Sequence, residues 1–152
     1  MARSIFVYVS YIRTTPERLW SALTDDIEFM KQYWFAGHCE SEWTVGSTWK
    51  LVSTDGEVMD QGEIVEVAPP RRLVIRYRHV LRDEFKSEDD VLCTIELEPR
   101  GAAVKLTVTH VMEREGSKFI AGVSLGWPVV VSNLKSLIES GAIAVVDPLP
   151  WA

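Results

Sequence analysis

The chain has 152 residues, of which 47% are hydrophobic and 25% charged, and its formal net charge at pH 7 is −6. These values indicate a folded protein, and the length predicts one domain over residues 1–152, with its core over residues 4–141. An acidic chain without clustered lysines and arginines argues against a nucleic-acid partner, and no apolar run approaches the ~20 residues that span a bilayer.

Cysteine usage indicates a reducing compartment. Cys39 and Cys93 are the two cysteines, they form no CxxC pair, and no signal-peptide pattern opens the chain. We therefore expect a cytoplasmic location.

The first forty residues predict one strand and two short helices. Residues 4–13 are β-branched and aromatic, which is typical of a strand. Thr15 suits an N-cap and Pro16 the first helical position, and the apolar residues that follow recur at helical spacing. Asp25 or Asp26 can cap a second short helix.

After Gly37 the apolar period changes from helical to alternating, which predicts six more strands. Their expected ranges are 39–44, 47–54, 58–67, 72–79, 91–98 and 102–111. The connection 80–90 is a longer, charged loop with Phe85 alone in its middle, and long loops are more often functional than short ones.

The helical period returns from Ser117 to Ser140, and Gly141 is suited to end that helix. Pro128 lies inside it, so we expect a kink near Ser124. The apolar tail, residues 142–152, is expected to lie extended on a surface or a partner. The order of elements predicts an α+β fold, in which a curved antiparallel sheet of about seven strands wraps around the long C-terminal helix.

Several sequence pieces resemble the SRPBCC (START-like) superfamily, and within it the family named after the C-terminal domain of the activator of the heat-shock protein 90 ATPase. They are Thr15–Asp25 (TPERLWSALTD), Val45-Gly46, Gly62-Glu63-Ile64, Pro69–Leu73 (PPRRL), Gly126-Trp127-Pro128 and Leu134–Gly141 (LKSLIESG). The resemblance runs from about residue 8 to residue 141. It implies the helix-grip fold and a hydrophobic cavity between sheet and long helix, but no single reaction. Co-chaperone members carry a separate N-terminal domain, for which we expect no room here.

Strand alternation selects the residues that face the long helix. On the last three strands it predicts inward side chains at Tyr77 and His79, at Cys93 and Ile95, and at His110. We expect His79, Val91 and His110 to share one end of the inner face, near Phe119.

Two histidines at one pocket mouth have more than one interpretation. They can be polar anchors or general acid–base groups, or partly buried histidines that bond to their neighbours. A metal site is less favoured, because the two imidazoles are expected two strand spacings apart, about 9.5 Å, and the sequence places no third metal ligand near them. His79 and His110 are therefore the candidate catalytic residues, with no metal and no cofactor expected.

Aromatic residues are numerous and supply about half of the predicted cavity wall. The predicted ligand-contacting residues are Trp34, Phe35, Trp49, Leu51, Tyr77, His79, Cys93, Ile95, His110, Phe119, Val123, Trp127 and Val130. Trp20 is expected to pack in the core. Cys93 is expected to face inward among apolar residues, an environment that raises the pKa of a thiol and makes the thiol inert.

These observations favour a protein that binds a small hydrophobic or amphipathic molecule. One alternative is an enzyme, such as a cyclase, dehydratase or hydrolase, that uses a pocket histidine. Another is a chaperone-linked interaction module that makes contact through the tail or a sheet edge. A homodimer is compatible with the sequence.

Overall fold

The computed structural model describes residues 2–146, and within them it has seven strands and four helices. The elements in chain order are β1 (Ser4–Ile12), α1 (Pro16–Leu23), α2 (Ile27–Tyr33), β2 (His38–Ser41), β3 (Thr48–Val52), β4 (Val58–Ala68), β5 (Arg72–His79), α3 (Asp83–Lys86), β6 (Val91–Arg100), β7 (Ala103–Met112) and α4 (Lys118–Ser140). The predicted order of strands and helices is confirmed. The connection 80–90 differs from the expected plain loop, because it contains the four-residue helix α3.

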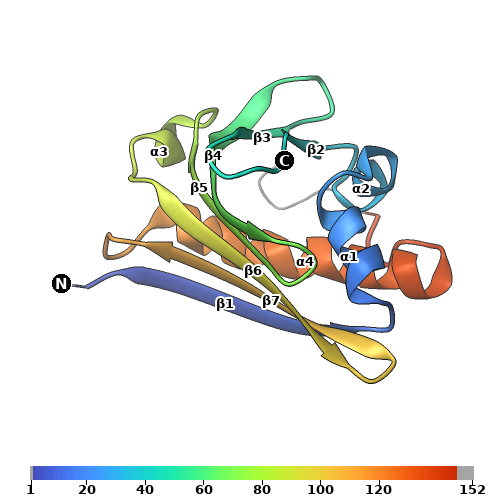
Figure 1. Cartoon of the computed structure of the whole chain (residues 1–152). Coiled ribbons are helices and arrows are strands. Elements are labelled where there is room, and N and C mark those ends of the chain that lie inside the picture. The colour runs from blue at the N-terminus through green and yellow to red at the C-terminus, as the bar shows by residue number, and fades with distance from the viewer. Residues whose placement is uncertain (1, 147–152) are drawn as a thin grey trace.

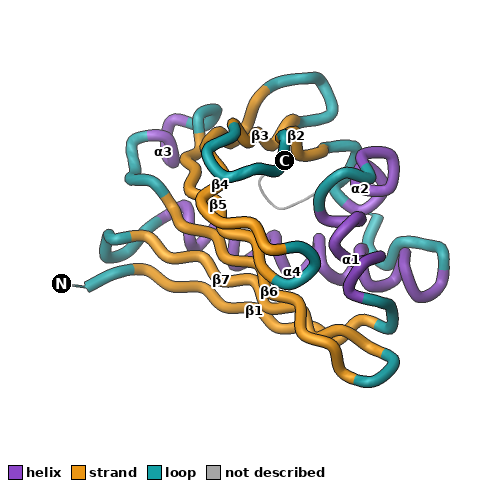
Figure 2. The backbone as a smooth tube through the Cα atoms, viewed as in Figure 1, coloured by secondary structure: helices purple, strands orange, loops and turns teal. Residues whose placement is uncertain are grey.

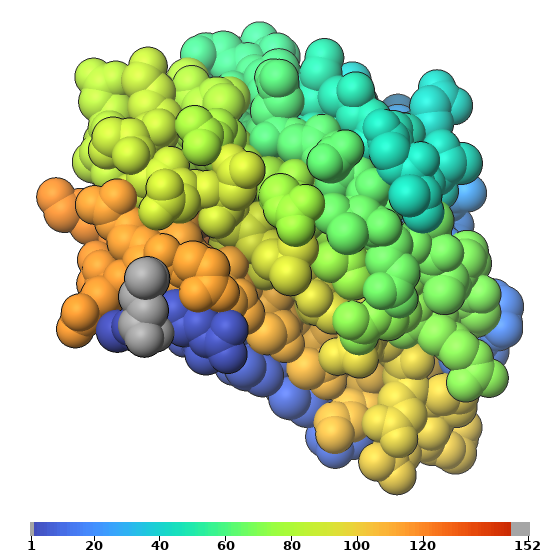
Figure 3. All heavy atoms as spheres, turned by 60° about the vertical axis from the view of Figure 1, so that its left-hand side comes forward, coloured from blue at the N-terminus to red at the C-terminus, as the bar shows by residue number. Residues whose placement is uncertain are grey.

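All seven strands form one antiparallel sheet in the order β1-β7-β6-β5-β4-β3-β2. The sheet curves around α4, which crosses behind it, while α1 and α2 lie at one end (Figures 1 and 2). This is the helix-grip arrangement, and the predicted fold class is confirmed. Figure 3, turned by 60° from Figure 1, shows the outer face of the sheet, which is the face away from α4. From β1 in blue, the colours pass through orange and yellow to green and cyan, in the order of the strands.

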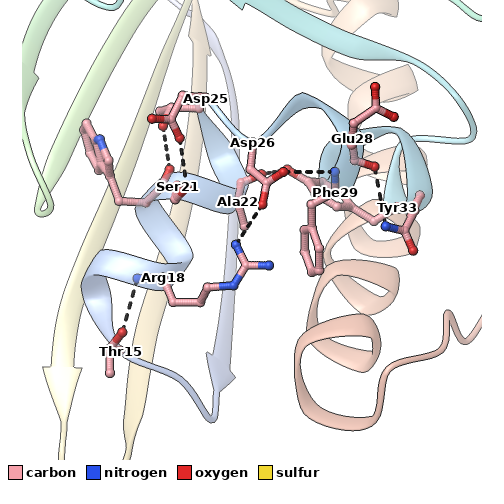
Figure 4. Close-up of polar contacts among 12 residues, drawn as sticks. Thr15, Arg18, Ser21, Ala22, Asp25, Asp26, Glu28, Phe29 and Tyr33 are labelled. Atoms are coloured by element: carbon pink, nitrogen blue, oxygen red, sulfur yellow. Dashed lines mark hydrogen bonds and ion pairs between the residues drawn. The ribbon is translucent and has the colours of Figure 1, made fainter.

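The two short helices begin at the predicted caps and are tied to each other. The Thr15 hydroxyl accepts a hydrogen bond from the Arg18 amide, and the Asp26 carboxylate accepts one from the Phe29 amide, both at 3.2 Å. Figure 4 shows these contacts together with the Arg18 guanidinium, which lies 3.3 Å from Asp26 and 4.2 Å from the Phe29 ring centroid. The two helices therefore pack against each other at one end of the sheet.

Helix α4 has a defined cap at each end. The Ser117 hydroxyl accepts from the Ile120 amide at 3.0 Å, and Gly141 ends the helix in the left-handed conformation at φ 83°. The helix continues on both sides of Pro128, and the kink expected there stays a prediction. Its buried face is apolar apart from Asn133, and consists of Phe119, Ile120, Val123, Gly126, Val130, Val131, Asn133, Leu134 and Leu137.

The apolar side chains of sheet and helices form one core. Trp20, expected inside, is half-buried and packs against the edge of that core. Within residues 2–146, no helix has the length and the apolar character needed to cross a bilayer.

Candidate ligand-binding cavity

A cavity of about 550 Å³ lies between the inner face of the sheet and α4. Strands β2 to β6 supply one wall, α4 supplies the other, and the ends of α2 and α3 contribute to its borders. Its aromatic lining consists of Tyr33, Trp34, Phe35, Trp43, Trp49, Tyr77, Phe85, Phe119 and Trp127. This volume and this lining are typical of small-molecule sites in proteins.

Most of the predicted ligand-contacting residues lie in the cavity wall. The eleven that do are Trp34, Phe35, Trp49, Leu51, Tyr77, His79, Cys93, Ile95, Phe119, Val123 and Trp127. Val130 and His110 are buried but lie outside the wall. Alternation on β5 and β6 places the wall residues correctly, because both strands keep an unbroken inside–outside pattern.

The expectation that His79, Val91 and His110 share one end of the inner face is wrong. Val91 pairs with Tyr77, and His110 pairs with Cys93, which itself pairs with Ile75. His110 is thus level with Ile75, four residues from His79 along β5. The reason is register: the short turn that pairs Arg100 with Ala103 fixes where β7 lies against β6, and alternation alone does not reveal this offset.

The two histidines consequently have different surroundings. The His79 ring lies 5.7 Å from the Phe119 ring, at the start of α4, whereas the His110 ring lies 5.6 Å from the Trp127 ring. His110 is fully buried, and its Nε2 is 2.9 Å from the Tyr77 hydroxyl. Burial lowers the pKa of His110 to about 3, so its imidazole is neutral at neutral pH.

His79 has a carboxylate partner that the sequence analysis missed. Its Nδ1 lies 2.8 Å from Oδ1 of Asp60, and these residues are 5% and 6% exposed. Burial raises the pKa of Asp60, while the hydrogen bond to His79 acts in the opposite direction. The signal was present, since Asp60 shares the inward parity of Ile64, but a register shift between Ile64 and Glu66 obscures the parity of β4.

The cysteines of the wall are not activated. Cys39 and Cys93 are both buried free thiols. Burial raises the pKa of the Cys93 thiol to about 12, and it raises the pKa of Cys39 further still. A thiol in this state is a poor nucleophile. Among the described residues, no three His, Cys, Asp or Glu side chains gather as metal ligands would.

Helix α3 brings Phe85 to the cavity, where its ring lies 5.4 Å from His79 and 5.7 Å from Phe119. The segment is held by Glu88, which is buried and whose carboxylate accepts hydrogen bonds from the Ser117 hydroxyl (2.6 Å) and the Lys118 amide (2.9 Å). Burial would raise the pKa of Glu88, but these bonds and the nearby Arg114 lower it overall. A carboxylate at the start of α4 is also favoured by the helix dipole.

The chain returns to the cavity after α4. Oδ1 of the fully buried Asn133 accepts hydrogen bonds from the amides of Ala144 (3.0 Å) and Val145 (2.7 Å), and its Nδ2 donates to the Val145 carbonyl (2.9 Å). These bonds place Val146 in the cavity wall. The rest of the predicted tail, including Trp151, lies outside the described residues.

The family model described as "Activator of Hsp90 ATPase homolog 1-like protein" matches residues 13–139. The chain belongs to this family. The resemblance seen in the sequence pieces is thereby confirmed, while no curated protein matches the chain.

Solved structures similar to this family member share its fold. A protein from Mesorhizobium loti superposes with a TM-score of 0.75 at 22% identity, covering 90% of this chain and 97% of that one. The Aha1 dimer from Colwellia psychrerythraea superposes with a TM-score of 0.72 at 21% identity, and the match covers 91% of this chain and 98% of that one. An HSP90 activator from Plasmodium falciparum superposes with a TM-score of 0.69 at 20% identity, and the match covers 91% of this chain and 96% of that one. At these identities the likeness shows the fold alone.

Proposed function

We propose that this member of the family binds a small hydrophobic or amphipathic molecule in the cavity between the sheet and α4. The observation that carries the proposal is the volume of about 550 Å³ enclosed by a mainly aromatic and aliphatic wall. Apolar surface in such a space is favourably transferred out of water, at about 25 cal/mol per Å². Few polar side chains interrupt the wall, so the ligand needs few polar groups of its own.

Titration with the fluorescent hydrophobic probe N-phenyl-1-naphthylamine tests this proposal. The wild-type chain should take up the probe saturably. Val123→Trp should weaken uptake, because Val123 faces the cavity from α4 and the larger ring would take up part of the space. Leu125→Trp is the matched control, since Leu125 is 61% exposed on the same helix. Equal uptake by both variants, or none by the wild type, would contradict the proposal.

An enzyme on this scaffold is a second candidate, and the Asp60–His79 pair in the cavity wall favours it. A histidine held by a carboxylate can act as a general acid or base toward a bound substrate. Its activity would be lost in His79→Gln while probe uptake continued. A turnover that survives this substitution would remove His79 from the reaction.

A chaperone-linked role is a third candidate, supported by the description of the family and by the solved HSP90 activator from Plasmodium falciparum. The purified chain would then stimulate the ATPase activity of an Hsp90 protein, through its tail or a sheet edge. An unchanged ATPase rate at saturating chain concentration would exclude this role for the isolated chain.

We further propose a homodimer that forms through the outer face of β1. This edge strand has no charged residue from Ser4 to Ile12, and its outward side chains are all apolar: Ile5 (52% exposed), Val7 (54%), Val9 (42%) and Tyr11 (51%). A two-fold axis near the middle of the strand would place this apolar row against itself, and a similar structure is a dimer. Val7→Lys should shift the sedimentation coefficient to that of a monomer, whereas Glu63→Lys on β4 should not. A wild-type chain that sediments as a monomer would contradict the dimer.

We also propose a single cytoplasmic domain. The two buried free thiols support a reducing compartment, and the described elements pack around one core. One cooperative unfolding transition is expected, and two separable transitions would contradict the single domain.

A further inference from the structure

We propose that His79, held by Asp60, is the polar anchor of the cavity and donates a hydrogen bond to an acceptor oxygen of the ligand. The ligand class is an apolar, aromatic-sized molecule that carries a ketone, ester or carboxylate oxygen. This inference rests on the proposed binding function and specifies its polar contact.

One ring nitrogen of His79 lacks a hydrogen bond. Nδ1 of His79 is hydrogen-bonded to Asp60, whereas Nε2 has no hydrogen-bond partner among the described residues. A buried polar group without a partner costs about 1–3 kcal/mol, and a ligand atom that bonds to it recovers part of that cost. His79 lies in the cavity wall and is only 5% exposed, so bulk solvent does not satisfy this nitrogen.

The second step is the direction of that hydrogen bond. Burial favours the state in which Asp60 and His79 together carry no net charge, because an isolated buried charge is costly. In that state one proton lies between Oδ1 and Nδ1, and Nε2 carries its own hydrogen. In this net-neutral pair, His79 presents an N–H donor at Nε2.

A second unused donor belongs to the same wall. Trp49 is 5% exposed, and its Nε1–H, which can only donate, has no nitrogen or oxygen acceptor in the described structure; its one neighbour of this kind is the Cys39 sulfur, a weak acceptor. Trp49 thus adds a second buried donor to the wall. This composition selects a ligand with acceptor oxygens over one with hydroxyl or amine donors alone.

Two aromatic rings lie beside the anchor. The His79 ring contacts Phe119 on α4 and Phe85, which is half-buried on the four-residue helix α3. These rings form the apolar surroundings of the His79 donor.

A matched pair of probes tests the anchor. 2-Acetylnaphthalene carries an acceptor oxygen and 2-ethylnaphthalene has nearly the same shape without one. Each is measured by displacement of N-phenyl-1-naphthylamine. Because water also solvates the ketone better, the informative quantity is the affinity ratio of ketone to hydrocarbon. This ratio should fall about three- to tenfold in His79→Phe relative to wild type, as expected for one lost hydrogen bond.

The controls separate this inference from the proposed function. His38→Phe removes a histidine outside the cavity wall and should leave the ratio unchanged. If neither probe binds the wild type, the binding function itself fails. If both bind but the ratio is the same in wild type and His79→Phe, the anchor alone is overturned.

Nitrogen-15 NMR of the wild-type chain gives a second readout that needs no variant. The Nε2 signal of His79 should be that of a protonated nitrogen and should shift on addition of 2-acetylnaphthalene but not of 2-ethylnaphthalene. An unprotonated Nε2, or a signal that neither probe moves, would overturn the anchor.

Discussion

His110 is a buried histidine whose surroundings determine its protonation state. Its imidazole is completely buried, and the Tyr77 hydroxyl lies 2.9 Å from its Nε2. His110 therefore lies in the core behind the wall residue Tyr77, and not in the cavity wall itself. Its role in the fold can be tested by pH.

Burial lowers the pKa of His110 from 6.5 to about 3, so the unfolded chain binds a proton between these pH values that the folded chain does not. The free energy of unfolding should therefore fall as the pH drops below 6.5, by up to about 1.4 kcal/mol per pH unit from this group. In His110→Gln this contribution should disappear, whereas the His38→Gln control should keep it. Urea unfolding at a series of pH values measures the slopes, and identical slopes in wild type and His110→Gln would contradict the assignment.

Gly62 shows how tightly β4 and β5 approach. A Cβ at this position would overlap the carbonyl oxygen of Arg76 and lie 2.6 Å from the Cα of Tyr77. Gly62→Ala should destabilise the fold by about 3 kcal/mol through overpacking. Gly122→Ala is the control, because its Cβ would meet Phe85 at an ordinary 3.4 Å and alanine favours a helix. Thermal unfolding compares them, and equal melting temperatures would contradict the expected clash.

Asp60 shows why part of the site is not readable from sequence. Asp60 alternates without interruption with the buried Ile64, but beyond the register shift between Ile64 and Glu66 it is Val67, of the other parity, that packs against the core. The sequence of β4 therefore does not show which parity faces inward. A lone aspartate in a polar stretch otherwise indicates a solvated surface. Its partner His79, on the unbroken strand β5, was predicted inward.

At the scale of elements, the starts and ends of helices were the most predictable features. Thr15, Pro16 and Gly141 act at the expected positions, because capping depends on local side-chain and backbone chemistry. Strand register was less predictable, as His110 shows, because turns and bulges fix it. Helix α3 was missed because four residues carry too little periodicity to be recognised.

Glu88 ties α3 to the start of α4, and its loss should loosen the Phe85 side of the cavity. Glu88→Gln should speed hydrogen exchange of the α3 amides about tenfold, since a charged acceptor is replaced by a neutral one. Glu84→Gln is the control, because Glu84 is exposed on α3. The lowered pKa of Glu88 means that its stabilisation is present above the unfolded-state value of 4.5 and is lost as the pH falls further. Exchange that is equally slow in both variants would show that another contact holds α3.

Asn133 holds the segment after α4 in place through hydrogen bonds to its backbone. Asn133→Leu should expose the amides of Ala144 and Val145 to rapid exchange, because both donate to Oδ1 of Asn133. Asn133→Asp keeps that oxygen and loses only the bond to the Val145 carbonyl, so its effect should be intermediate. Unchanged protection in Asn133→Leu would mean that the segment is held by other contacts.

For the molecule as a whole, the sequence was sufficient for the fold and for the part of the cavity wall on β5, β6 and α4, because these follow from alternating strands and one long amphipathic helix. It was insufficient for the volume that remains between them. Whether Trp49, Phe119 and Trp127 fill the interior or border a hollow depends on ring orientation, and the structure leaves about 550 Å³. That hollow is the basis of the proposed function.

Xenon binding tests the hollow most directly, because xenon enters apolar cavities in proteins. In a crystal of the wild-type chain pressurised with xenon, we predict xenon density between Tyr77, Val123 and Trp127 that is absent from crystals of Val123→Trp. A wild-type interior that takes up no xenon, with these side chains in mutual contact, would contradict the account.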